Sequence, residues 1–369
     1  DAAARHREAL AHHDDGRHAR WLEGTATLRL ATRPAGATAT IRAWQIRDRQ
    51  RLLGDPVYTG PAAGDVALPA GNYLIELGFP GRPPVRHGVR LARLGDHVAD
   101  VFLPTAVAEG AVYIPAGPCT IGGDPQAPDA FPATLVEVPG FAADRFPVTN
   151  AQFLAFLNAL VDAGQADEAL RHAPRQFVGG QSGVLYPRDD DGHFGLGADS
   201  DGTVWRPDDP VVQVSWHGAM AYAAWRAART GHAWRLLHEV EWEKAARGVD
   251  GRAYPWGDAF DPVFAASLHS LPGPPLRQLV HAFPTDESPY GLRGLGGNVR
   301  DWCLNAWADE RPAGLLEVAT PAAGDDRLRA TRGGSYVSLA PMCRAATRFA
   351  APPGAHYGSV GFRLGYSLP

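Results

Sequence analysis

Arg332–Leu364, which reads RGGSYVSLAPMCRAATRFAAPPGAHYGSVGFRL, is the stretch that decides the fold of this chain. Two rigid blocks, Arg332–Ser335 and Gly361–Leu364, bracket an insert that lacks helical or strand periodicity. Glycines in both blocks permit positive φ or close backbone approach, so each block can lead into a strand beside other backbone. Because prolines such as Pro341 and Pro352 interrupt regular structure, the insert is predicted to form ordered surface loops, where binding residues tend to lie.

Six further motifs precede this stretch, each a short run that mixes aromatic, glycine, proline or charged residues. They are Phe146–Asn150 (FPVTN), Pro210–Trp216 (PVVQVSW), Glu241–Gly248 (EWEKAARG), Tyr254–Asp258 (YPWGD), Ser288–Gly291 (SPYG) and Gly297–Trp302 (GNVRDW). In this order, and together with the terminal stretch, they resemble the formylglycine-generating-enzyme, or sulfatase-modifying-factor, domain. That family is related to the C-type lectin fold, and the resemblance covers roughly Val112 to Leu364.

The composition is that of a folded globular protein, with 45% hydrophobic and 20% charged residues. At 369 residues, the chain can hold two domains with sizeable cores. Its formal net charge of -5 argues against a general nucleic-acid binder. The sequence has no apolar run of about 18 residues, so no membrane span is predicted. Cys119, Cys303 and Cys343 are too few for a disulfide framework, which favours a cytoplasmic location.

Residues 1–24 are rich in Ala, Arg, His and Asp and predict a helical linker left from a preceding domain. The chain opens on Asp1, which fits a fragment of a longer protein. Some relatives carry a three-histidine iron site in a separate helical domain, but these residues contain no HxxxH pair with a trailing acid. A solvated helix is therefore preferred for the segment that holds His6, His12, His13 and His18.

Residues 25–107 have a sequence pattern that predicts a small all-β sandwich. Short alternating runs such as Ala26–Leu30 and Tyr73–Leu77 are broken by Pro-Ala-Gly turns. The pattern resembles the PEGA-type module, for which we expect a spacer or surface-contact role. Such a module followed by this domain resembles the C-terminal half of bacterial serine/threonine kinase fusions, so a covalently preceding kinase domain is one expected partner.

Residues 108–369 predict an α+β domain with a C-type-lectin-like fold. Its three helices are expected after the cap candidate Thr149 and ending at Gly164, after Ser215 and ending at Gly231, and over about Glu239 to Arg247 before Gly248. Its tryptophans are large enough to anchor long loops in a core, and they are Trp205, Trp216, Trp234, Trp242, Trp256, Trp302 and Trp307. Glu239, Glu241 and Glu243 are expected on a solvated helix face, with Glu243 paired to Arg247 at i,i+4.

The resemblance implies a copper(I) site of two thiolates, spaced Cys-x4-Cys just after the Gly-Gly-Ser block. Here the first position is Ser338 and the second is Cys343. A serine hydroxyl is a hard, neutral ligand that suits copper(I) poorly, so the sequence predicts a disabled site and a buried, apolar Cys343. A copper-dependent oxidase is the alternative interpretation.

The resemblance also implies a structural calcium ion at Gly297–Val299, where Asn298 and Val299 would supply oxygens with Asp301 nearby. The alternative is that Asn298 and Asp301 only hydrogen-bond the loop. The family's other calcium site is expected to be lost, because an asparagine expected after the Pro-Trp-Gly motif is Ser267.

The insert after Ser335 mixes aromatic, small and polar side chains, a composition that resembles an antibody paratope. Variable proteins of diversity-generating retroelements share this fold, and their diversified segment lies between similar blocks. The chain is therefore predicted to recognise a protein or small-molecule ligand, with ordinary loop packing as the alternative. The candidate residues are Tyr336, Val337, Ser338, Leu339, Thr347, Phe349, Ala350, Ala351, Ala355, His356, Tyr357 and Ser359.

Overall fold

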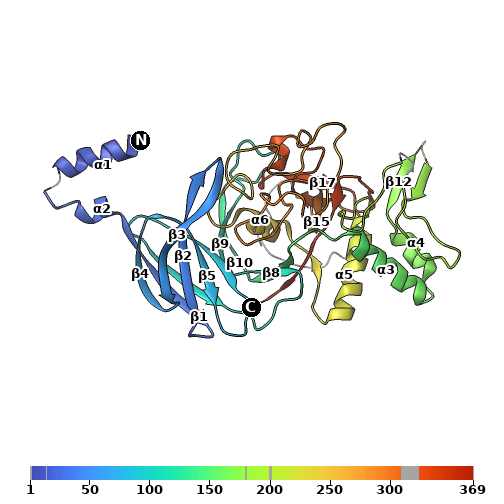
Figure 1. Cartoon of the computed structure of the whole chain (residues 1–369), viewed down its shortest axis with the longest axis horizontal. Coiled ribbons are helices and arrows are strands. Elements are labelled where there is room, and N and C mark those ends of the chain that lie inside the picture. Colours follow the sequence, from blue (N-terminus) through green and yellow to red (C-terminus); the bar gives the residue numbers. More distant parts are fainter. Residues whose placement is uncertain (1, 14, 179–180, 199–201, 309–323, 369) are drawn as a thin grey trace. The chain divides into compact units, whose positions relative to one another are not determined.

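The computed structural model describes residues 2–13, 15–178, 181–198, 202–308 and 324–368 (Figure 1). The chain divides into two compact units. Unit 1 contains Asp1–Arg47 and Arg51–Ala106, and unit 2 contains Asp48–Gln50 and Val107–Pro369. None of the described helices is long and apolar enough to cross a membrane.

Unit 1 begins with two helices, α1 (Ala2–His13) and α2 (Ala19–Glu23). The four histidines of this segment are exposed, as expected of a solvated helix. Across the described residues, no group of three His, Cys, Asp or Glu side chains could hold a metal ion.

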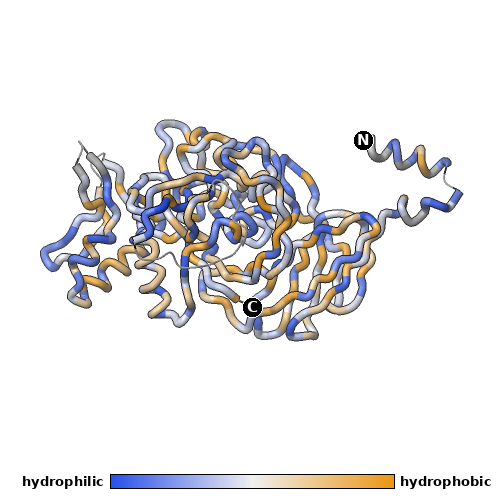
Figure 2. Tube along the Cα trace, turned by 180° about the vertical axis from the view of Figure 1, so that it is seen from behind, coloured by the Kyte–Doolittle hydropathy of each residue, from blue (hydrophilic) through white to orange (hydrophobic). Residues whose placement is uncertain are grey.

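Seven strands of unit 1 form two sheets, ordered β4-β1-β7 and β3-β2-β5-β6. The strands are β1 (Thr25–Arg33), β2 (Thr38–Arg47), β3 (Gln50–Pro61), β4 (Gly64–Pro69), β5 (Gly71–Gly78), β6 (Val85–Leu91) and β7 (Asp96–Phe102). Alternate residues along β1, including Leu28 and Leu30, are buried, so this strand gives one face to the core. The apolar and polar segments alternate along these strands in Figure 2.

Unit 2 has two four-stranded sheets, ordered β14-β19-β11-β8 and β17-β16-β15-β18, and two strand pairs, β9 with β10 and β12 with β13. The strands are β8 (Ala111–Ile114), β9 (Gly117–Ile121), β10 (Thr134–Val138), β11 (Phe141–Asp144), β12 (Arg175–Val178), β13 (Gln181–Val184), β14 (Arg235–Leu236), β15 (Arg300–Ala306), β16 (Arg329–Arg332), β17 (Arg348–Ala351), β18 (Val360–Gly361) and β19 (Leu364–Ser367). Strands from both ends of the unit therefore share one sheet, as β19 pairs with β11.

Three helices of unit 2 lie where the sequence predicts them, and two of these begin at the predicted caps. The helices of this unit are α3 (Asn150–Asp162), α4 (Ala166–His172), α5 (Trp216–Thr230), α6 (Glu239–Arg247) and the short 3-10 helix η1 (Ala340–Cys343). Thr149 and Ser215 accept hydrogen bonds from the first turns of α3 and α5, and Gly231 ends α5 with a φ of 75°. The short helices α4 and η1 are not predicted by the sequence.

The core of unit 2 is built on aromatic side chains, as the sequence predicts. Phe362 contacts Tyr222 and Phe153, with ring centroids 5.5 and 6.1 Å apart. Six of the seven tryptophans are buried, and Trp307 packs against the core with part of its surface exposed.

Glycines of the two terminal blocks lie directly against other backbone. A Cβ on Gly334 would lie 2.2 Å from the carbonyl oxygen of Gly296, and one on Gly361 would lie 2.4 Å from that of Val211. Any larger residue would push these segments apart, so the close approach inferred from the sequence is confirmed.

The acidic cluster on α6 corrects the sequence analysis. Glu239, Glu241 and Glu243 are all buried, although a solvated face was expected. Arginines neutralise them. Glu239 accepts from Arg348 Nε (2.7 Å), and Glu243 pairs with Arg332 Nη2 (2.5 Å) as well as with Arg247 at i,i+4, as expected. The expectation of a solvated face was wrong because Arg332 and Arg348 lie about 90 to 110 residues away in sequence, where helical spacing carries no signal.

Candidate functional site

The position of the first family thiolate is occupied by a hydroxyl that is fully engaged. Ser338 Oγ accepts hydrogen bonds from the backbone N–H of Ser335 (3.0 Å) and from Arg300 Nη2 (3.1 Å). Because these bonds use both of its lone pairs, the Ser338 hydroxyl donates its own proton to Ser335 Oγ, 2.9 Å away. No lone pair of Ser338 is left for a metal ion.

The second thiolate position, Cys343, is completely buried at the end of η1. Burial raises the pKa of its thiol to about 12, so the sulfur stays protonated at neutral pH. One thiol, a saturated hydroxyl and the adjacent Arg300 guanidinium do not fit a copper(I) ion, which binds a pair of thiolates. Cys119 and Cys303 are also buried, and all three thiols are free.

Arg300 lies at the start of β15, beside this centre. Its backbone N–H donates to the carbonyl oxygen of Ser359 (2.9 Å), and its guanidinium carbon lies 3.9 Å from the ring centroid of Phe349. Burial lowers the pKa of the Arg300 guanidinium, although an arginine stays charged at neutral pH. The sequence analysis assigned no role to Arg300, because only the fold brings it to Ser338.

The Gly-Asn-Val turn is held by hydrogen bonds. Asn298 Oδ1 accepts from the N–H of Gln278 (2.9 Å), and Asn298 Nδ2 donates to the carbonyl of Gln278 (2.8 Å). Asp301 Oδ2 accepts from Arg363 Nε (2.6 Å), whereas Asp301 Oδ1 is buried and has no hydrogen-bond partner among the described residues. A calcium ion bound by Asn298, Val299 and Asp301 stays a prediction.

Three predicted surface residues of the insert are buried, so their expected exposure was wrong. Ser338 belongs to the hydroxyl pair with Ser335. Thr347 Oγ1 donates to the carbonyl of Pro341 (2.8 Å), and Ala351 packs in the aromatic core from β17. A loop composition of small and polar residues does not reveal which of them turn inward.

The other candidates keep exposed surface. Val337, Leu339 and Tyr357 are each more than two-fifths exposed, and Ala350 is exposed as well. Those that are half-buried are Tyr336, Phe349, Ala355, His356 and Ser359.

Two parts of the insert come together through Tyr336. Its hydroxyl donates to the carbonyl of Gly358 (3.2 Å), which joins the loop after the Gly-Gly-Ser block to the loop before the Gly-Phe-Arg block. The second loop is itself fixed, since His356 Nδ1 lies 2.7 Å from the carbonyl oxygen of Gln213. Val337 and Tyr357, which flank this contact, therefore extend from anchored backbone.

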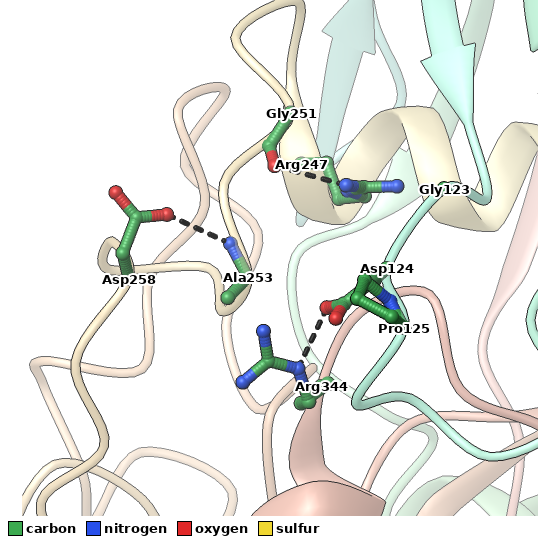
Figure 3. Close-up of a pocket in the computed structure, with 8 residues that line it drawn as sticks. All are labelled: Gly123, Asp124, Pro125, Arg247, Gly251, Ala253, Asp258 and Arg344. Atoms are coloured by element: carbon green, nitrogen blue, oxygen red, sulfur yellow. Dashed lines mark hydrogen bonds and ion pairs between the residues drawn. The ribbon is translucent and has the colours of Figure 1, made fainter. Parts of the chain in front are cut away.

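A polar pocket of about 260 Å³ lies elsewhere in unit 2 (Figure 3). Arg344 Nε donates to Asp124 Oδ2 (2.6 Å) across it, and Arg247 Nη2 donates to the carbonyl of Gly251 (2.9 Å). The lining residues are Gly123, Asp124, Pro125, Arg247, Gly251, Ala253, Asp258 and Arg344. This pocket could not be predicted from the sequence, because its walls come from segments that are far apart in the chain.

Comparison with known proteins identifies the family. The model of the sulfatase-modifying factor enzyme 1-like domain matches residues 100–367. The chain belongs to this family. The family match therefore spans the aromatic core, the Ser338–Cys343 centre and the insert.

Relatives in this family differ in the activity that their names state. The chain is 31% identical over 305 residues to a formylglycine-generating enzyme of Thermomonospora curvata, which covers 70% of this chain and 94% of that protein. It is 30% identical to an inactive Cα-formylglycine-generating enzyme 2 of Bos taurus, over 68% of this chain and 86% of that protein. Sequence similarity to the family alone therefore does not assign catalysis.

Two further matches concern architecture. The chain is 30% identical to the serine/threonine-protein kinase Pkn1 of Chlamydia trachomatis, over 70% of this chain but only 38% of that kinase. Among solved structures, PvdO from Pseudomonas aeruginosa matches with a TM-score of 0.56 and 23% identity, over 70% of this chain and 94% of PvdO. This likeness to PvdO supports the α+β family fold.

Proposed function

We propose that this chain is a recognition module, in which a formylglycine-generating-enzyme scaffold has lost its copper centre and presents its C-terminal loops to a ligand or protein partner. The observation that carries the proposal is the hydrogen bond from Arg300 Nη2 to Ser338 Oγ. It places a cation where copper chemistry needs an electron-rich thiolate.

The rigid attachment of the insert supports a binding role. Arg332–Ser335 and Gly361–Leu364 lie in the buried scaffold, while Val337, Leu339 and Tyr357 remain exposed between them. Binding sites are more precise when exposed groups extend from rigid elements. Retroelement diversification of these loops is the sharper form of the proposal, and sequencing the neighbouring DNA for a template repeat and a reverse transcriptase tests it.

A copper-dependent oxidase is the competing function, favoured by the similarity to formylglycine-generating enzymes. The test combines copper(I) titration with a mass-spectrometric assay for oxidation of a cysteine in a sulfatase-type peptide. We expect no turnover by the parent and none by Ser338→Cys, because Arg300 still faces the new thiol. Turnover by the parent would overturn the recognition proposal.

A matched double variant tests whether Ser338 and Arg300 account for the proposed loss of copper binding. In Ser338→Cys with Arg300→Leu, the second thiol is present and the cation is gone. We expect this variant to bind copper(I) more tightly than Ser338→Cys alone. Equal copper affinity in the two variants would mean that Arg300 does not oppose the metal.

The similarity to Pkn1 supports a second proposal, that the chain serves as the sensor part of a kinase fusion. Sequencing the gene upstream of Asp1 tests it, since a kinase domain in the same reading frame is required. The three free, buried thiols support the proposed cytoplasmic location, because reducing compartments preserve free cysteines.

A further inference from the structure

Arg300 differs from the arginines buried in the same unit. Arg363 pairs with Asp301 (2.6 Å), Arg348 with Glu239 (2.7 Å), and Arg332 pairs with the acids of α6. Within the described ranges, Arg300 has no carboxylate within ion-pair distance, and its hydrogen-bond acceptor is the neutral Ser338 hydroxyl. A charge in such surroundings is costly unless an anion compensates it, so the site is short of one negative group.

The donors of Arg300 are only partly used. Its Nε is buried and has no hydrogen-bond partner among the described residues. Its Nη2 donates to Ser338, and Nη1 has no acceptor in the part of the chain that the structure describes. The guanidinium therefore retains unused N–H groups in its plane.

The guanidinium is also held in place. Phe349 covers one face of it at 3.9 Å, and strand pairing of Arg300 with Val360 fixes its backbone. A fixed, planar donor loses little entropy when it binds a ligand. The Arg300 side chain is not fully buried. The exposed Val337 and Ala350 are the chain neighbours of Ser338 and Phe349, the two residues that contact it, so a ligand can approach from the side of the insert.

We propose that Arg300 is the anchor for a carboxylate group of the ligand. This rests on the proposed recognition function and names the chemistry that the loops would select. A carboxylate is planar and accepts two parallel hydrogen bonds from one guanidinium, which matches the unused donors of Arg300. The carboxylate could belong to a small organic acid or to the free C-terminus of a peptide.

The Figure 3 pocket is the strongest competitor for an anion, and it is less suitable. Its two arginines already have acidic partners, Arg344 with Asp124 and Arg247 with Glu243. Arg344→Gln therefore serves as a matched control, because it removes a guanidinium that already has an acidic partner (Figure 3).

The experiment measures thermal stabilisation when acetate replaces chloride at constant ionic strength. Ligand that binds only the folded chain raises its melting temperature. We expect acetate to stabilise the parent and Arg344→Gln, but not Arg300→Gln. Equal stabilisation of the parent and Arg300→Gln overturns the proposal, and loss confined to Arg344→Gln assigns the anion to the Figure 3 pocket instead.

Arg300→Lys keeps the charge and covers the case in which Arg300→Gln does not fold. Because lysine lacks the planar fork, we expect acetate to bind it about tenfold more weakly than the parent. Undiminished affinity would contradict the fork-shaped contact. A short peptide with a free C-terminus, compared with its amidated form, then separates the two carboxylate sources.

The oxidase assay on the same preparations separates the two proposals. Turnover by the parent would overturn the recognition function and leave the acetate result standing. An Arg300-independent acetate response without turnover would overturn only the carboxylate site.

Discussion

Arg363 Nε donates to Asp301 Oδ2 over 2.6 Å, and both side chains are almost completely buried. Asp301 also accepts from Trp242 Nε1 (2.8 Å), and Arg363 Nη2 donates to the carbonyls of Arg293 and Gly294. The ion pair joins the GNVRDW motif to the GFRL block that closes the insert. Asp301 and Arg363 therefore hold these two segments of the scaffold together.

Removing one partner of this pair should be costly. We expect Arg363→Met to lower the free energy of unfolding by about 3 to 5 kcal/mol, because it leaves Asp301 buried and unpaired. Arg171→Met is the control, since Arg171 pairs with Glu168 on the exposed surface of α4 and its loss should cost less than about 1 kcal/mol. Urea denaturation measures both, and equal effects would contradict the role given to the buried pair.

The N-cap of α6 predicts a dependence on pH. His238 Nδ1 accepts from the N–H of Val240 (3.2 Å), and burial lowers the pKa of the imidazole. The unfolded chain therefore binds the proton more readily, and stability should fall as the pH drops from about 7 to 5. His238→Asn supplies a cap that does not titrate. Over the same pH range, the free energy of unfolding of this variant should therefore fall less than that of the parent, by up to about 1 kcal/mol.

Denaturation curves of the parent and His238→Asn at both pH values check this. All other residues are the same in both proteins, so the difference between the two slopes reports on His238. Identical slopes would mean that the cap does not depend on neutral imidazole.

The sequence predicts the fold well where local patterns decide it. Thr149 and Ser215 cap helices because side-chain oxygens satisfy free N–H groups of the first turn, an effect that needs no distant partner. The close backbone contacts at the glycines of the terminal blocks could also be predicted, since only glycine tolerates neighbouring backbone at such a short distance. The family resemblance rested on these local motifs.

The site is less predictable because its contacts are long-range. Arg300 and Ser338 are 38 residues apart, and Glu239 and Arg348 are 109 apart. Neither pair has a spacing that a helix or strand would produce, so neither the burial of the acids of α6 nor the contact of Arg300 with Ser338 could be predicted.

The calcium prediction is tested best at Asn298, whose φ is 68°. Asn298→Gly keeps this left-handed conformation without strain and removes the side chain with its oxygen, whereas Asn298→Ala would add backbone strain. If calcium binds the turn, a chelator should lower the melting temperature of the parent but not that of Asn298→Gly. If a chelator leaves the melting temperature of the parent unchanged, calcium does not bind the turn, and Asn298 only hydrogen-bonds Gln278.

The last prediction separates the recognition surface from its scaffold. We expect Val337→Ser, Leu339→Ser and Tyr357→Ser each to change the free energy of unfolding by less than about 0.5 kcal/mol, because these side chains are exposed. Phe362→Ala should cost about 3 to 5 kcal/mol, since its ring packs in the aromatic core. Gly334→Val should also destabilise strongly, because its Cβ would meet backbone.

Combining the three serine substitutions tests binding directly. Stability alone cannot distinguish a binding surface from an inert one, so the immobilised parent and triple variant are compared for proteins and small molecules retained from a lysate of the source organism. A ligand that the parent retains and the equally stable triple variant loses would require the exposed loop side chains. Retention of the same ligands by both proteins would place recognition elsewhere on the chain. A large loss of stability in the triple variant would instead mean that these side chains pack against their own domain, as in an ordinary loop.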